Sequence, residues 1–544
     1  PSEGQVFTFG SDSRPSRIRS NLYQVQDNLS MSRGRHSFKF GANLVRTLSA
    51  LRDTPSDLGD YFYAASSTQA SGFANFVANT PTFAFQHFGN FGGRGGEELP
   101  LRIFSQYYFA EDDFRTSPFF VLSLGFRYEN FGQPVSRLAQ LNPNFTGAIQ
   151  RDNLDFGPRI GFAWGLGART ALRGGYGIFY NPAAFDLVLI NLQGGRISPF
   201  VAGVPTNVYP QPPFNPNDAL KHVTDCDSLT LSAGPGPTFA DCTHEDLSAS
   251  KLLQPRAQSA ALTFERQLGE SVLFQAGYVG NISTQLLERV NLNPRRGWQI
   301  QNPCIVSPCA VALPRVNPNR GEITMVQNGA RSSYHSLQAS ATKRYARPGF
   351  LRGLALTAAY TWSHMIDTGS EIFDPDVRRA RSFKSLRRNP NTVEILSIFA
   401  QDAKNPHTGE RGNSSFDRRH RGSASFLWTL PSPGSGIERG LLGGWELGGV
   451  FSAQAGQPFS PLNSFGACSD ASGDGILTND RPSIGSISAP LDRIALVADP
   501  NCVSIAPGAL SSTGYIDTQG QPIDPATAHF VQVPLGHKPG TSFT

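Results

Sequence analysis

Apolar and polar residues alternate along several stretches of the chain. In residues 119–130 the alternate positions Phe120, Leu122, Leu124, Phe126 and Tyr128 are apolar, and the opposite face carries Ser123, Gly125, Arg127 and Glu129. A period of two is typical of a β-strand with two different faces. The same alternation occurs elsewhere, although Val450 falls on the polar face of its strand; these stretches are 37–44, 261–267, 353–365 and 444–454. We therefore predict a mostly β chain.

The predicted strands form six hairpins with short connections. Their strand pairs are 20–32 with 36–48, 102–115 with 119–130, 156–165 with 169–180, 257–268 with 271–282, 333–345 with 353–366, and 420–430 with 440–456. Long segments rich in Pro, Asn and Gly separate the hairpins, namely 49–101, 131–155, 181–256, 283–332, 367–419 and 457–528. Short turns at one end of the strands and long loops at the other are typical of outer-membrane barrels. Such long connections are uncommon in compact soluble domains.

This pattern predicts an all-β fold, an antiparallel transmembrane β-barrel of outer-membrane type with long extracellular loops and short periplasmic turns. The apolar faces that end in Tyr128 and Trp362 resemble an aromatic girdle at a membrane interface. A soluble β-sandwich or propeller is the alternative, but no repeat of propeller period is present. Further strands are expected near 4–10, 73–88 and 528–533.

Composition agrees with a β architecture. The 544 residues include 55 glycines and 40 prolines, and only 16% are charged, which leaves few of the residues that fill soluble helices. A net charge of +5 is too dilute for a nucleic-acid partner. No apolar run reaches the roughly 18 residues of a transmembrane helix. The first residues lack a signal-peptide pattern, so we expect a mature terminus or a start within a longer chain.

The sequence contains no catalytic motif. Searches for G-x-S-x-G, H-E-x-x-H and the Walker A pattern fail, so we predict that the chain is not an enzyme. The glycine cluster at 89–100 lacks a strand-to-helix context and is interpreted as a loop rather than a phosphate site. Glu111, Asp112 and Asp113 are interpreted as rim charges of a strand rather than an acid/base pair.

The six cysteines fall two per long loop. Cys226 and Cys242 lie in 181–256, Cys304 and Cys309 in 283–332, and Cys468 and Cys502 in 457–528. An even count outside the strands fits an oxidising compartment, and the simplest pairing is within each loop. Three local disulfides are therefore predicted. A zinc site formed by His222, Cys226, Cys242 and His244 is the alternative, but its spacing matches no common zinc motif.

The segment 468–482 has the acidic spacing of a calcium loop. Asp470, Ser472 and Asp474 occupy positions 1, 3 and 5 of an EF-hand pattern, followed by Gly475. Position 12 is Arg481 instead of the usual Glu, which leaves Asp480 as a substitute carboxylate. Two interpretations stay open: a structural calcium ion held by Asp470, Ser472, Asp474 and Asp480, or a turn stabilised by its own Asp and Asn side chains with no cofactor.

Several segments resemble the barrel of TonB-dependent outer-membrane receptors, specifically the Oar-like branch. The resemblance lies in 36–46, 107–129, 155–164, 170–181, 333–345, 358–367, 417–431 and 443–461, which follow the family order. A full member would also bring a signal peptide, a regulatory-like domain, a TonB box and a plug, and none is visible. The resemblance therefore implies that 1–544 is a partial barrel, incomplete at both ends, since plugged transporters have about 22 strands and the pattern gives twelve.

The resemblance also implies a function and partners. We expect an outer-membrane TonB-dependent receptor or transporter for an unidentified ligand, working with the TonB system; a structural or adhesive binding protein without transport is the alternative. The polar faces would line the lumen and contact a plug or, less often, a substrate, through Lys39, Arg127, Glu129, Arg173, Glu265 and Glu446. The basic segment around His420 would face lipopolysaccharide phosphates or water, and outer-membrane lipid would surround the barrel.

Overall fold

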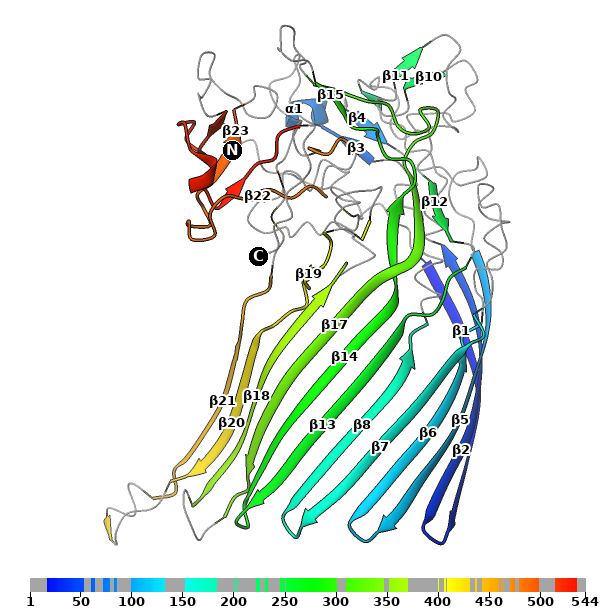
Figure 1. Ribbon diagram of the computed structural model, residues 1–544, viewed down its shortest axis with the longest axis vertical. Helices are drawn as coiled ribbons and strands as arrows, with labels where there is room; N and C mark the ends of the chain where they lie inside the picture. Colours follow the sequence, from blue (N-terminus) through cyan, green and yellow to red (C-terminus); the bar gives the residue numbers. More distant parts are fainter. Residues whose placement is uncertain are drawn as a thin grey trace.

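Twelve long strands form one continuous antiparallel sheet (Figure 1). The structure is a computed structural model and describes residues 17–52, 60–63, 72–78, 83–85, 99–132, 152–182, 201–202, 222–225, 230–232, 245–249, 251–300, 310–346, 352–369, 400, 406–407, 409–430, 436–437, 443–458, 461, 463, 470–474, 479–498 and 514–535. The twelve strands are β1 (Arg17–Arg33), β2 (His36–Arg52), β5 (Leu99–Ser117), β6 (Phe120–Asn130), β7 (Asp155–Gly167), β8 (Thr170–Tyr180), β13 (Arg256–Leu268), β14 (Val272–Asn291), β17 (Ile323–Lys343), β18 (Leu354–Asp367), β20 (His420–Thr429) and β21 (Glu446–Gln454).

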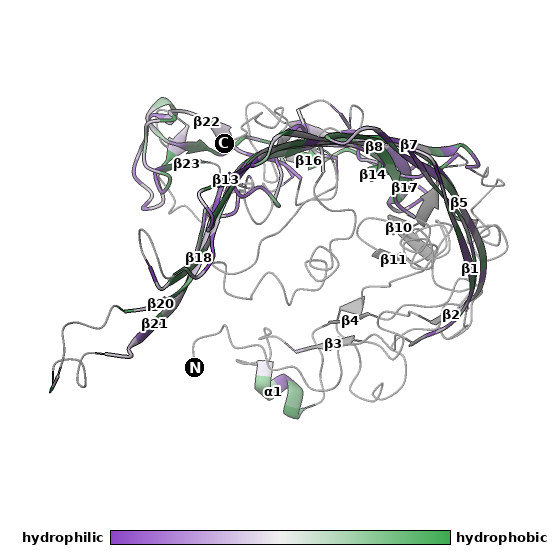
Figure 2. Ribbon diagram, turned by 90° about the horizontal axis from the view of Figure 1, so that it is seen from below, coloured by the Kyte–Doolittle hydropathy of each residue, from purple (hydrophilic) through white to green (hydrophobic). Residues whose placement is uncertain are grey.

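All twelve predicted barrel strands are confirmed, and each pairs with its neighbour along this order. Seen along the strands, the sheet curves into an arc (Figure 2). Among the described residues, β1 pairs only with β2 and β21 only with β20, so the sheet is not closed. An open arc of this kind is what the sequence predicted as an incomplete barrel.

The strand register separates two faces. Residues directly opposite each other in an antiparallel pair share a face, so Phe126 of β6 lies with Ala110 of β5 and Pro158 of β7. These belong to the apolar set, whose large side chains are exposed: Phe126 is 49% exposed and Trp362 54%. In a barrel the apolar face points outward to lipid and the polar face inward.

Two of the tight turns need glycine. Gly34 between β1 and β2 has φ +62°, and Gly269 between β13 and β14 has φ +60°. Residues other than glycine rarely adopt this left-handed conformation. These turns lie at the periplasmic end of the barrel, opposite the long loops.

The long loops form small elements of their own at the other end of the sheet (Figure 1). Three small sheets are β3 (Asp60–Phe62) with β4 (Phe83–Phe85) and β9 (Val201–Ala202), β10 (His222–Asp225) with β11 (Thr230–Ser232), and β15 (Trp298–Ile300) with β16 (Ala310–Ala312). A fourth joins β22 (Ser483–Ile484), β25 (Phe530–Val531), β23 (Ile494–Val497) and β24 (Tyr515–Ile516). The short β12 (Glu245–Ser248) pairs with β17, and β19 (Gly412–Asn413) with β18.

Two expected extra barrel strands are wrong. The segment 73–88 contains the helix α1 (Gly72–Val77) and β4, which pairs outside the barrel sheet. The segment 528–533 contains β25, whose Val531 packs with Ala495, Ile523 and Ala528 in a small core of the loop region. Local apolar clusters resemble barrel strands in sequence, but these are too short to cross a membrane. The expected strand at 4–10 lies outside the described residues.

Helical structure is sparse. In the described ranges, α1 and the 3-10 turn η2 (Pro525–Thr527) are short, and no helix there has the length and apolar character to cross a membrane.

Candidate functional site

The inner face of the sheet carries a ladder of charged side chains. All six predicted lumen residues lie on this face, because register places them opposite other polar-face residues; the pairs are Lys39 with Glu111, Glu129 with Tyr107, Arg127 with Phe109, Arg173 with Thr263, Glu265 with Ala171, and Glu446 with Thr429. The register therefore confirms that these six residues share the polar face of the sheet.

Most of these charges are paired within the wall. Lys39 Nζ lies 3.4 Å from Asp113 Oδ2 and 3.9 Å from Glu111 Oε1. Arg127 forms an ion pair with Glu129. Arg173 Nε lies 3.4 Å from Glu265 Oε1. Because these groups are partly exposed, each pair contributes little to stability, and its main effect is to fix the charge pattern of the wall.

Glu111, Asp112 and Asp113, predicted as one set of rim charges, are divided between the two faces of β5. Glu111 and Asp113 face the lumen, whereas Asp112 faces outward opposite Phe38. The outward carboxylate of Asp112 lies 2.7 Å from His36 Nδ1. His36 directly follows the periplasmic turn, so this charged pair sits at the membrane edge.

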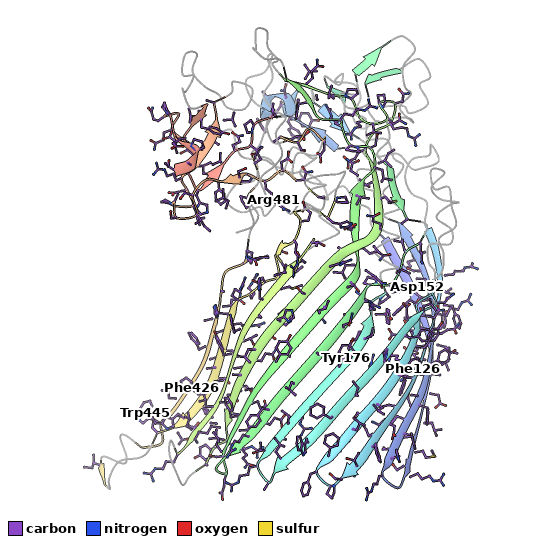
Figure 3. The ribbon with its side chains drawn as sticks, viewed as in Figure 1. Phe126, Asp152, Tyr176, Phe426, Trp445 and Arg481 are labelled. Atoms are coloured by element: carbon purple, nitrogen blue, oxygen red, sulfur yellow. The ribbon has the colours of Figure 1, made fainter. Side chains whose placement is uncertain are left out.

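Three external loops meet above the sheet. The indole Nε1 of Trp298 donates to the Asp470 carbonyl at 2.7 Å, which joins loop 283–332 to loop 457–528. Arg481 Nη2 lies 2.9 Å from Glu410 Oε2, which joins loop 457–528 to loop 367–419; both side chains are largely buried. Figure 3 shows Arg481 above the end of the sheet. These two contacts connect the three loops into one unit, which we call the cap. Removal of one partner of a buried ion pair leaves the other charge buried and unpaired, which is costly.

The candidate calcium residues are brought together in this cap. Asp470 Oδ1 accepts from Asp474 N at 2.9 Å and from the Ser472 hydroxyl at 3.4 Å. Asp480 Oδ2 accepts from Ser472 N at 2.8 Å, and Asp474 Oδ2 accepts from the Asn479 amide at 2.7 Å. These bonds are those of a turn held by its own side chains. Within the described part of the chain, no group of three or more His, Cys, Asp or Glu is placed to hold a metal ion. Calcium binding stays a prediction.

The Asp480 carboxyl group of the cap has a pKa far from its ordinary value. Its side chain is 1% exposed, and its Oδ1 atom has no hydrogen-bond partner. Burial, together with the nearby charge of Asp470, raises the pKa of Asp480 to about 7, although the hydrogen bonds from Ser472 oppose the shift.

The remaining predicted site residues lie largely outside the described residues. All six cysteines and His244 do so, and the same holds for most of the glycine cluster at 89–100. His222 begins β10. The three disulfides therefore stay predictions.

The model of the outer membrane beta barrel domain matches residues 2–530, which is nearly the whole chain. The chain belongs to this family. The barrel therefore resides in the outer membrane, and its family is one of membrane barrels rather than enzymes. A search of curated proteins finds no match.

Several solved structures are similar to this barrel. The outer membrane transporter YddB from Escherichia coli has a TM-score of 0.40 and 12% identity, covering 76% of this chain and 40% of its own. A ferric enterobactin receptor from Pseudomonas aeruginosa has a TM-score of 0.37 and 12% identity, and the match again covers 76% of this chain and 40% of the receptor. The siderophore receptor PirA from Acinetobacter baumannii has a TM-score of 0.36 and 9% identity, and the match covers 81% of this chain and 48% of the receptor. The barrel thus spans less than half the length of these structures.

The raised pKa of Asp480 predicts a pH dependence of the cap. Between the ordinary carboxyl pKa near 4 and the folded value of about 7, the folded cap binds more protons than the opened cap. The closed cap should therefore be most stable below about pH 4, lose stability as pH rises to about 7, and change little above that. Hydrogen exchange of residues 470–482 checks this, and Asp480→Asn should remove the slope. A slope that persists in Asp480→Asn would assign it to another group.

Proposed function

We propose that this barrel is part of a TonB-dependent outer-membrane receptor that takes up a ligand, as in the Oar-like branch that its sequence resembles. The observation that carries the proposal is the combination of a charged inner wall with a connected cap of three external loops. The cap offers a folded surface for ligand capture at the cell exterior, through the contacts of Trp298 with Asp470 and of Arg481 with Glu410. The wall offers polar groups along the path inward.

The ligand class is also a proposal. The solved structures with a similar fold include, by their titles, a ferric enterobactin receptor and an iron transporter. We therefore take ferric siderophores as the first ligands to examine, and the TonB system as the source of energy for their passage.

Uptake by the full-length protein distinguishes transport from binding alone. Cells that express it should accumulate radioactive iron supplied as ferric enterobactin or another ferric siderophore, and accumulation should fall at least tenfold when TonB is deleted. Binding at the cell surface should survive that deletion. Surface binding of a ligand with no TonB-dependent accumulation of any supplied ligand would instead support an adhesive or structural binding protein.

We also propose that lipopolysaccharide contacts the outward face at the external end of β18 and β20. Trp362 is exposed there, opposite His420 in the register. Next to them, Arg419 Nη2 lies 2.7 Å from His364 Nε2, and Asp417 holds Arg419 Nε at 2.9 Å. Guanidinium groups bind phosphate well, and aromatic side chains gather at membrane interfaces. The arrangement fits a phosphorylated lipid headgroup in the outer leaflet.

Arg421 supplies a matched control for this contact. Arg421 is opposite Thr361 on the inner face, whereas the Arg419 guanidinium reaches the outward His364. Arg419→Ala should lower the lipopolysaccharide that co-purifies with the protein several-fold, and Arg421→Ala should leave it unchanged. Equal amounts in both variants and in the parent protein would contradict the contact.

A further inference from the structure

Arg159 is a cation of the inner wall without a charge partner. It lies on β7 opposite Gly125 of β6 and Gly177 of β8. Its guanidinium stands over the Phe179 ring at 4.5 Å from the centroid. Within the described part of the chain it makes no ion pair or side-chain hydrogen bond, and its Nε atom is buried without a partner.

The inward-facing carboxylates of β5, β6 and β13 are already paired. Glu129 pairs with Arg127, and Glu111 and Asp113 share Lys39. On the next strands, Glu265 pairs with Arg173. Among these wall groups, Arg159 is therefore the cation that forms no ion pair with a carboxylate. A buried N–H donor without an acceptor is costly, so such a group commonly has a partner that the described residues do not supply.

A cavity lies directly beside this guanidinium. It has a volume of about 390 Å³ and is lined by Arg159, Arg127, Glu111, Ser123, Gly125 and Gly161, among others. Its charged lining therefore includes two arginines and one glutamate, and that glutamate already faces Lys39. The charged lining residues sum to a net positive charge, which favours an anion in the cavity.

Two glycines keep the cavity clear. A Cβ atom added at Gly125 or Gly161 would meet nothing closer than 3.5 Å, so neighbouring atoms do not exclude a side chain there. Glycine inside a strand weakens it and often marks the close approach of a ligand or another backbone. A side chain at either position would instead project into the space next to Arg159.

We propose that this cavity binds a carboxylate group that enters from the lumen. The planar guanidinium of Arg159 offers paired N–H donors that match a carboxylate, and the ring of Phe179 fixes its plane. The carboxylate has two sources: an acidic side chain of a lumen-filling segment of the same protein, or a carboxylate-bearing solute in passage. The proposal rests on the barrel wall alone, so it stands or falls separately from the transport function.

Carbodiimide coupling in outer membranes that contain the full-length protein tests the proposal. Arg159→Lys places an amine in the cavity, and carbodiimide joins amines to carboxylates in contact with them. The reaction is run with isotope-labelled citrate as the probe, and the product at position 159 is identified by mass spectrometry. Arg421→Lys is the control, because Arg421 is exposed on the same face away from the cavity. Both variants are first checked for heat-modifiable migration.

The product at position 159 identifies the source. A cross-link to a carboxylate of the same protein outside this wall supports the lumen-filling segment. A citrate adduct at least tenfold more abundant at 159 than at 421 supports a solute. Equal yields at the two positions, no product at 159, or cross-links only to Glu111 or Glu129 would overturn the proposal.

Wild-type protein gives a second readout if Arg159→Lys does not fold. Phenylglyoxal modifies unpaired guanidinium groups, so its reaction at Arg159 and at Arg421 is followed with and without citrate, in wild-type protein and in Phe179→Ala, where the ring no longer covers the Arg159 guanidinium. At least fivefold slower reaction at Arg159 than at Arg421 that persists in Phe179→Ala without citrate supports the lumen-filling segment, and slowing at Arg159 that needs citrate supports the solute. Equal reaction at both arginines under both conditions would also overturn the proposal.

Discussion

The structure depends on the backbone hydrogen bonds between neighbouring strands. Lipid offers no partner for a peptide N–H or C=O, so a chain that crosses a bilayer as strands must bond every strand to the next. The continuous ladder from β1 to β21 meets this requirement along its length. The same ladder fixes the register, and the register decides which side chains face lipid and which face the lumen.

The two functional surfaces follow from that division. The inner wall receives the charged residues of alternate positions, and most of them pair across strands, as Lys39 does with Asp113 and Arg173 with Glu265. Arg159 remains unpaired beside a cavity. At the external end, where water again surrounds the backbone, the chain leaves the ladder and its long loops bond to one another through contacts such as that of Arg481 with Glu410.

The sequence predicted the features that depend on local pattern. Alternation located all twelve strands, and it assigned residues such as Arg127 and Glu446 to the inner face correctly. It missed features that depend on distant residues. The isolation of Arg159 follows from how the other strands of the wall share their charges, and the docking of Trp298 on Asp470 joins residues far apart in the chain. The apolar segments at 73–88 and 528–533 were misread because length and pairing partners, rather than alternation, distinguish a barrel strand from a small loop sheet.

The central claim is that each strand separates lipid from lumen, and the adjacent residues Ala358 and Ala359 test it most directly. Ala358 pairs with Ala341 and Ala424 on the outward face, and Ala359 pairs with Ser340 and Ser423 on the inward face. The free energy of unfolding in lipid vesicles should fall by about 2–4 kcal/mol in Ala358→Arg if the site lies near mid-bilayer, and by much less in Ala359→Arg. An equal loss in both variants, or a larger loss in Ala359→Arg, would contradict the account.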